Sequence, residues 1–400
     1  MNLSGERLTH QGTAVTAGKL ALTFAELSST GGLFANEMAV TGSRLLLKGA
    51  LESKSSAQIK ADELQLGGEL RTGTDLALGA TLLTLSGTQH IGGNLQLQAD
   101  QVDVSGELEV GKQLKLDAKT LASSGKLLAS QADIAAVNWQ QRGELTTDDA
   151  LVWRGDKLAQ EADGLLQAGG ALSLSGDDIT LAGDVAAKGD VAVAANSYQQ
   201  EGTMNAAQVL RIDASTLQLG GTTQAKTAQL HSQVGTSRGQ HLIGQQLSWQ
   251  SDTLTNQGWL QAGDSLTLTG RALENEGTAI AGGDHQLNAT ERLANRGNLA
   301  GNTLSLTTKV LQNSGLLPMA GFGERLQREL IEPLPDLLQR YQQLLALWPT
   351  PLNSALPINL QFQGLRLEGW LGGLHQRADG GLLSITTIPN SIGSIKARKW

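Results

Sequence analysis

Acidic side chains are the first residues of this 400-residue chain to consider for chemistry. Two pairs, Asp148-Asp149 and Asp177-Asp178, have the composition needed for general acid-base catalysis of sugar hydrolysis or for holding a cation. Such chemistry requires several groups to converge on one face. The two pairs stand at different offsets from the glycines that recur along the chain, so we expect them on different faces and interpret each as a solvated turn.

Histidine and cysteine are the other candidates for catalysis or metal binding. The histidines are His10, His90, His231, His241, His285 and His375. None belongs to an H-x-x-x-H or H-E-x-x-H pattern, so the sequence predicts no zinc site, and we expect surface or turn positions. Cysteine is absent, which removes thiol nucleophiles and thiolate ligands. We therefore predict no metal and no cofactor.

Tryptophan can stack on sugar rings, and aromatic residues on an exposed sheet face are a common carbohydrate-binding device. Trp139, Trp153, Trp249 and Trp259 are candidates for such a platform. Their offsets from the nearest recurrent glycine are inconsistent, however, so packing inside the protein is the favoured interpretation.

Charge and hydropathy exclude several partners. The chain has 30 Lys+Arg against 38 Asp+Glu, with no basic run that could neutralise successive phosphates, so nucleic acid is not a predicted partner. No apolar stretch reaches the about 18 residues of a membrane span. The first residues lack a secretory signal. If the protein is exported, we expect the export module upstream in a longer parent chain, or this chain to be a remnant of one.

The main feature of the sequence is a glycine that recurs every 18 to 21 residues. The recurrent glycines are Gly12, Gly31, Gly49, Gly68, Gly87, Gly106, Gly125, Gly143, Gly164, Gly183, Gly202, Gly221, Gly239, Gly258, Gly277, Gly297 and Gly315. Apolar and polar residues alternate between them, as in Leu95-Gln-Leu97, which is typical of half-buried strands. A unit this short accommodates two or three strands and their turns but not a βαβ unit.

The last repeats share the pattern L-x-N-x-G. Its members are Asn256 with Gly258, Asn275 with Gly277, Asn295 with Gly297, and Asn313 with Gly315. A glycine at a recurrent turn relieves the clash of a positive φ or lets adjacent turns approach closely. If equivalent positions stack, the four asparagines can hydrogen-bond as an amide ladder.

These features predict an all-β fold over residues 1–317, a right-handed parallel β-helix with coils of about nineteen residues. At ~4.8 Å per coil it would be a monomeric rod on the order of 80 Å long. A two-layer sandwich is the main rival, but it does not demand so regular a register.

Residues 318–400 differ from the repeats, and we predict a small C-terminal α+β segment there. Apolar spacing between 323 and 348 predicts two short helices split at Pro333-Leu334-Pro335, followed by strand-like alternation from Ile358. The segment would cap the solenoid or lie near a receptor. One helix face offers possible partner-binding residues: Leu337, Tyr341, Leu344 and Trp348.

The rhythm Leu254-Thr-Asn256-Gln-Gly258-Trp-Leu260-Gln-Ala262-Gly263 resembles the internal repeats of filamentous-haemagglutinin-type exoproteins of two-partner secretion. That family includes adhesins and contact-dependent growth-inhibition toxins. The resemblance covers residues 12–317 and implies a repeat shaft that is secreted or held at the cell surface of a Gram-negative bacterium. It also implies export by an outer-membrane partner transporter, acting through an upstream domain, and a target-cell receptor or glycan. The Asn-Pro-Asn motifs of the family's secretion domain are absent, and no toxin-like module is evident.

The resulting hypothesis is a non-catalytic structural shaft that acts in adhesion or contact-dependent toxin delivery. A β-helical polysaccharide-processing enzyme is the alternative from another class, suggested by fold analogy alone. A non-functional fragment of a larger exoprotein is the third possibility.

Overall fold

The computed structural model describes residues 1–317, together with 356–362, 365–371, 374–375, 384–385 and 398–399. The chain divides into two compact units, Met1–Gln229 and Leu230–Trp400. Every regular element in the described residues is a β-strand. Each unit is described by itself below.

One coil of unit 1 shows how the sequence is folded. Its strands are β12 (Thr88–Ile91) and β13 (Leu95–Val104). Inward residues alternate along β13 as Leu95, Leu97 and Ala99, and then the alternation shifts by one residue so that Val102 and Val104 are buried. The shift marks a corner, because a straight strand keeps a strict period of two. Each coil therefore has three faces, which we name A (β12), B (start of β13) and C (end of β13).

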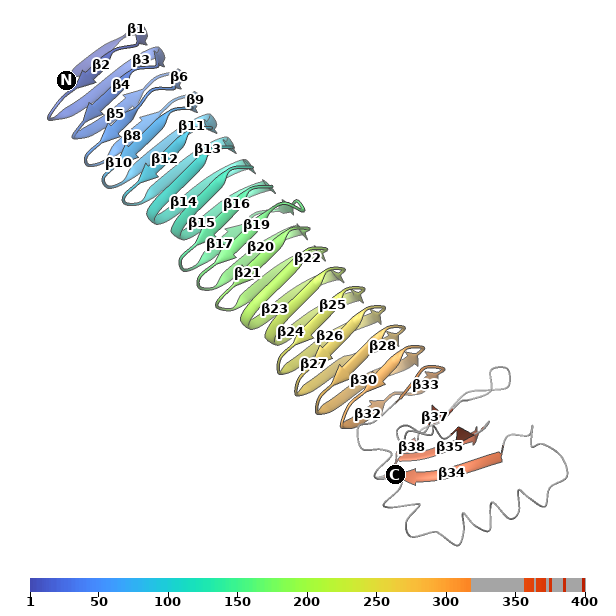
Figure 1. Cartoon of the computed structure of the whole chain (residues 1–400). Coiled ribbons are helices and arrows are strands. Elements are labelled where there is room, and N and C mark those ends of the chain that lie inside the picture. Colours follow the sequence, from blue (N-terminus) through green and yellow to red (C-terminus); the bar gives the residue numbers. More distant parts are fainter. Residues whose placement is uncertain (318–355, 363–364, 372–373, 376–383, 386–397, 400) are drawn as a thin grey trace. The chain divides into compact units, whose positions relative to one another are not determined.

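Unit 1 repeats this coil from its first strand onward, and Figure 1 shows the successive strands lying side by side. Its remaining strands are β1 (Asn2–His10), β2 (Thr13–Val15), β3 (Lys19–Ser29), β4 (Gly32–Ala35), β5 (Glu37–Thr41), β6 (Arg44–Leu47), β7 (Leu51–Ser53), β8 (Ala57–Lys60), β9 (Glu63–Leu66), β10 (Glu69–Thr72), β11 (Leu76–Leu85), β14 (Glu107–Ser123), β15 (Lys126–Gln141), β16 (Glu144–Thr147), β17 (Leu151–Arg154), β18 (Lys157–Gln160), β19 (Leu165–Ala168), β20 (Leu172–Leu181), β21 (Asp184–Ala187), β22 (Val191–Gln200) and β23 (Thr203–Leu219).

Parallel pairing with the equivalent strand of the next coil sets the register. On face B, Leu76 pairs with Leu95 and Leu95 with Leu114. Each step advances one repeat of the glycine pattern, so side chains of the same kind stack in columns. Stacked leucines fill the interior of the coils, and Leu76, Leu95 and Leu114 are each at most 1% exposed. Burial of these columns is the main stabilising contribution, at about 2 kcal/mol for each fully buried leucine.

Unit 2 continues with the same kind of coil, and β24 (Thr222–Ser237) has residues in both units. Its solenoid strands are β25 (Gln240–Ile243), β26 (Gln246–Asn256), β27 (Trp259–Ala262), β28 (Ser265–Asn275), β29 (Thr278–Ala281), β30 (Asp284–Asn295), β31 (Asn298–Ala300), β32 (Thr303–Thr307) and β33 (Val310–Asn313). Further strands are β34 (Leu356–Phe362), β35 (Leu365–Leu371), β36 (Leu374–His375), β37 (Ser384–Ile385) and β38 (Arg398–Lys399).

The predicted β-solenoid of about nineteen-residue coils is confirmed. Its parallel ladders exclude the sandwich, whose sheets are antiparallel. Right-handed winding, the hand that parallel crossovers favour, stays a prediction. Antiparallel pairing of β34 with β35 agrees with the alternation expected from Ile358. The two predicted helices between 323 and 348 lie outside the described residues.

Candidate functional site

The four L-x-N-x-G asparagines form one continuous hydrogen-bonded stack in unit 2. The Nδ2 group of each donates to the Oδ1 atom of the next, at 2.7 Å from Asn256 to Asn275, 2.8 Å from Asn275 to Asn295 and 2.7 Å from Asn295 to Asn313. The first three side chains are at most 2% exposed. The amides thus bond to one another inside the protein, which joins four successive coils at a fixed register.

The same amides also satisfy backbone groups at the corner between faces C and A. Asn256 Nδ2 donates to the Thr278 carbonyl of the next coil at 3.2 Å, and its Oδ1 accepts from the Gly258 N–H at 3.2 Å. Asn275 Nδ2 likewise donates to the Gly277 carbonyl at 3.2 Å. The asparagine therefore holds its own turn and the following coil together.

The recurrent glycines are required by close approach between coils. A Cβ atom on Gly277 would overlap the carbonyl oxygen of Gly258, and one on Gly297 would overlap that of Gly277. The same clash recurs at Gly258 and Gly315 with the glycine one coil earlier. None of these glycines has a φ in the left-handed region. Of the two roles considered from sequence, the tight packing of turns is therefore correct and the positive φ is wrong.

In unit 1, glutamine side chains make the corresponding hydrogen bonds at the corner between faces C and A. This role was not predicted from the sequence. Gln160 Nε2 donates to the Gly164 carbonyl at 2.9 Å and to the Asp184 carbonyl of the next coil at 3.0 Å. Gln200 Nε2 makes the equivalent bonds to Gly202 at 2.6 Å and Thr222 at 2.9 Å. A sequence signal was present, because Gln200 stands two residues before a recurrent glycine, as the asparagines do.

Most of the tryptophans considered for a sugar platform are core residues. Trp139 is 2% exposed, and Trp153 and Trp249 are 0% exposed, so none of the three can stack on a ligand. The indole N–H groups of Trp139 and Trp153 donate to Ser123 Oγ at 2.8 Å and to the Ala136 carbonyl at 3.2 Å. Trp259 differs from them, because its side chain lies at the surface and is 41% exposed.

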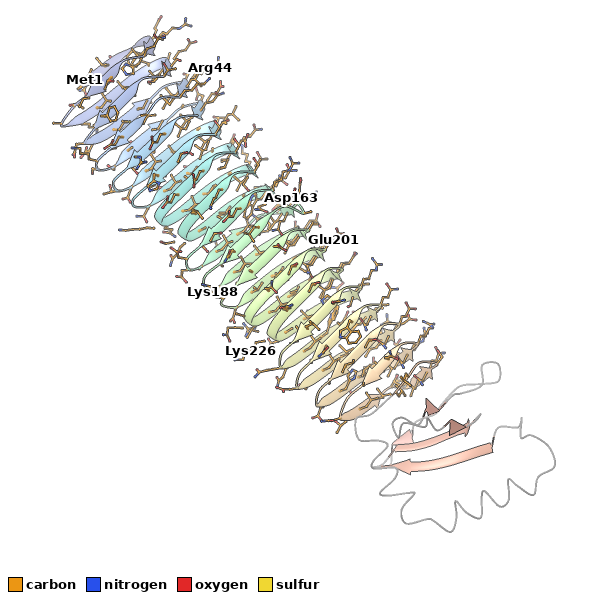
Figure 2. All side chains as sticks on the ribbon, in the orientation of Figure 1. Met1, Arg44, Asp163, Lys188, Glu201 and Lys226 are labelled. Carbon is orange, nitrogen blue, oxygen red and sulfur yellow. The ribbon has the colours of Figure 1, made fainter. Side chains whose placement is uncertain are left out.

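The acidic pairs do not converge. Asp148-Asp149 follows β16 at the corner between faces A and B, whereas Asp177-Asp178 lies within β20 at the corner between faces B and C. All four side chains are exposed, which agrees with solvated turns. Charged residues in general point outward in unit 1, as Figure 2 shows for Arg44, Asp163 and Glu201.

Among the histidines whose side chains the structure describes, the expectation of surface positions is wrong for His241 and His285. His241 and His285 are inward residues of unit 2, at 2% and 0% exposure. His285 lies in a face-B column between Leu266 and Leu304, and its Nδ1 bonds the Ala300 carbonyl at 3.0 Å. Burial lowers the pKa of His285 to about 4, with the Ala300 bond acting weakly in the other direction. Offsets along a single repeat did not reveal this, because the histidine replaces an apolar residue in only one coil.

A shallow groove of about 530 Å³ crosses several coils of unit 1 at the corner between faces B and C. Its floor includes Ala80, Ala99 and Ala118, whose small side chains create the depression. An ion pair, Lys119 with Asp100 at 3.0 Å, lines one side. The groove presents charges of both signs.

The described residues contain no cluster of three or more histidine, aspartate and glutamate side chains that could hold a metal ion. Within the same residues no helix is long and apolar enough to span a membrane. The possible partner-binding residues Leu337, Tyr341, Leu344 and Trp348 lie outside the part of the chain that the structure describes.

Comparison with known proteins gives one partial match. Residues 274–399 match the family described as the RecC C-terminal domain, which is less than half of the chain. The described portion of that stretch begins in β28 and contains the last coils of unit 2. No curated protein and no solved structure matches the chain.

Proposed function

We propose that residues 1–317 form the structural shaft of a secreted bacterial surface exoprotein of the filamentous-haemagglutinin type. In this proposal the shaft is non-catalytic and holds a binding or toxin element away from the cell that makes it. It acts in adhesion or in contact-dependent toxin delivery, and it reaches the surface of a Gram-negative cell through an outer-membrane partner transporter that recognises an upstream domain.

The observation that supports this proposal best is the coil-to-coil register within each unit. Every coil contributes the same three parallel strands, so a unit grows by about 4.8 Å for each repeat added. Such a stack depends only on neighbouring coils, so its length can change without redesign of a core. That property suits a spacer.

The buried asparagine and glutamine side chains at the corner between faces C and A give further support. The asparagine stack joins four successive coils in unit 2, and glutamines such as Gln160 and Gln200 join individual pairs of coils in unit 1, through buried amides. A chain that must remain intact outside the cell benefits from such links, because local opening of one coil then breaks satisfied buried bonds.

Surface labelling of the source cells tests the proposal. Antibodies raised against residues 1–317 should label intact cells, and protease added outside should remove the signal. Labelling that appears only after lysis would contradict the surface assignment. Co-culture of the strain and its deletion mutant with target cells then separates the two roles, since adhesion changes attachment and toxin delivery changes target survival.

A further inference from the structure

Face A of unit 2 presents an outer surface with no formal charge over four coils. The strands that form it are β25, β27, β29 and β31, within which His241 is turned into the core. Their outward residues are Gln240, Leu242, Trp259, Gln261, Thr278, Ile280, Asn298 and Ala300. All eight side chains are exposed or half-buried. The surface therefore consists of amides, a hydroxyl, short aliphatic groups and one indole.

Trp259 lies at the centre of this surface. Its Nε1 donates to the Oε1 atom of Gln261 at 3.1 Å, which ties the polar edge of the ring to a residue on the same side of the same strand. The neighbours in its column are Gln240 and Thr278. Leu242 and Ile280 flank Gln261 in the adjacent column. An aromatic face thus stands among side chains that both donate and accept hydrogen bonds.

Trp259 distinguishes this surface from other uncharged parts of face A, such as Thr203 and Asn205 in β23. In unit 2 the ion pairs Arg271–Glu291 and Arg296–Glu276 lie outside these strands. Some earlier coils of unit 1, in contrast, carry ion pairs on face A, such as His90–Glu109 and Lys126–Glu144. A phosphate or sulfate partner would require cations, and a basic partner would require carboxylates, so neither matches face A of unit 2.

Neutral sugars match it in chemistry. A sugar ring has an apolar C–H face that can lie on an indole, and hydroxyls that both donate and accept hydrogen bonds with amide and hydroxyl side chains. We infer that face A of unit 2, centred on Trp259, binds neutral oligosaccharides. This inference deepens the proposed function, on which it rests, by naming the class of partner.

Binding of the full chain to defined sugars tests the inference. Calorimetric titration would use cellohexaose, maltohexaose and the hexamer of N-acetylglucosamine as neutral probes, with dextran sulfate as the anionic one. The informative variant is Trp259→Thr, because threonine occupies the same column one coil later at Thr278. Val310→Thr is the matched control, since Val310 is 47% exposed and lies on β33, outside face A.

The expected result is binding of at least one neutral probe that weakens about tenfold in Trp259→Thr and stays unchanged in Val310→Thr. Circular dichroism should show both variants folded. Failure of all three neutral probes, equal affinity in the Trp259 variant, or binding of dextran sulfate alone would overturn the inference. Surface labelling of cells is independent of sugar binding, so a shaft found at the surface that binds no neutral probe refutes this inference and leaves the proposed function standing.

Discussion

Asn275 donates a hydrogen bond from Nδ2 to Oδ1 of Asn295 at 2.8 Å, although the two residues are 20 positions apart in sequence. Both side chains are buried, at 2% and 1% exposure. Asn275 also accepts the corresponding bond from Asn256 at 2.7 Å. A single side chain therefore links three consecutive coils, and the stack carries register information that the apolar columns alone do not supply, since stacked leucines tolerate small slips.

Replacement of Asn275 by alanine should destabilise unit 2. The change leaves Asn256 Nδ2 and Asn295 Oδ1 each without one buried partner, so we expect a loss of about 2–4 kcal/mol in the free energy of unfolding. Urea denaturation of the full chain followed by circular dichroism measures it. Asn302→Ala is the control, because Asn302 is exposed. Equal stability of the two variants would argue against a structural role for the stack.

Replacement of Gly277 by alanine should destabilise the coils by about 2 kcal/mol or more, because the new methyl group overlaps the Gly258 carbonyl and the backbones must separate. Gly12 is the matched control. It occupies the equivalent position in the first coil, and no atom lies within 4 Å of the place that its methyl group would take. Gly12→Ala should therefore leave the stability unchanged. Thermal unfolding of both variants distinguishes the cases, and similar melting temperatures would refute the close-approach explanation.

The sequence predicts the position of a residue well where that residue recurs in successive coils, and poorly where it occurs in one coil only. The L-x-N-x-G motif recurs in every late coil, so its stacking follows from the period alone. The burial of Trp139 and Trp153 does not follow from the period, because rings of this size need small neighbours in adjacent coils. Gly176, one coil beyond Trp153, leaves the room that the indole occupies. Volume compensation of this kind between coils is not visible in offsets from one glycine.

Buried polar residues that occur in a single coil are also not predicted from the repeat. Gln89 and His285 each occupy an inward column whose neighbours in the coils before and after are leucines. The period correctly identifies the columns, but a glutamine or histidine in one coil resembles a surface residue until the register is known. The face of unit 2 centred on Trp259 is similar, since its lack of charge becomes apparent only when four strands are laid side by side.

Gln89→Leu should stabilise unit 1. Gln89 is 0% exposed, and neither Nε2 nor Oε1 has a hydrogen-bond partner, while leucine matches Leu70 and Leu108 in the column. We expect a gain of about 1–3 kcal/mol, the cost of burying the unsatisfied amide. Gln160→Leu is the contrasting variant and should destabilise, because it removes bonds to Gly164 and Asp184. Denaturation midpoints that shift in the same direction for both would contradict this account.

Acid should weaken unit 2 through His285. Because its folded pKa of about 4 lies below the ordinary value of 6.5, its contribution to stability is fully present above about pH 6.5 and is lost as the pH falls toward 4. The loss reaches about 3 kcal/mol. Urea midpoints measured from pH 7.5 to 4 should fall less steeply in His285→Leu, where leucine matches Leu266 and Leu304. Parallel profiles for the two proteins would show that His285 is not the titrating group.

Deletion of one whole coil should be tolerated. Removing residues 88–106 brings Glu107 to the position of Thr88, its partner one coil earlier, so every column remains in register. Removing residues 88–97 instead places outward residues in the core and should abolish cooperative unfolding. Circular dichroism melting of the two deletions checks this. A whole-coil deletion that melts as poorly as the partial one would contradict the repeat register.

Spin-label distances along one column of unit 1 test the solenoid most directly. The chain has no cysteine, so labels can be placed by substitution at Gln96 paired in turn with Ser173, Ala192 and Arg211, which lie in one outward column of face B. Double electron–electron resonance should give backbone separations of about 19, 24 and 29 Å, which correspond to four, five and six coils at ~4.8 Å each. Distances that do not rise in equal steps would contradict the coil stack on which the whole account depends.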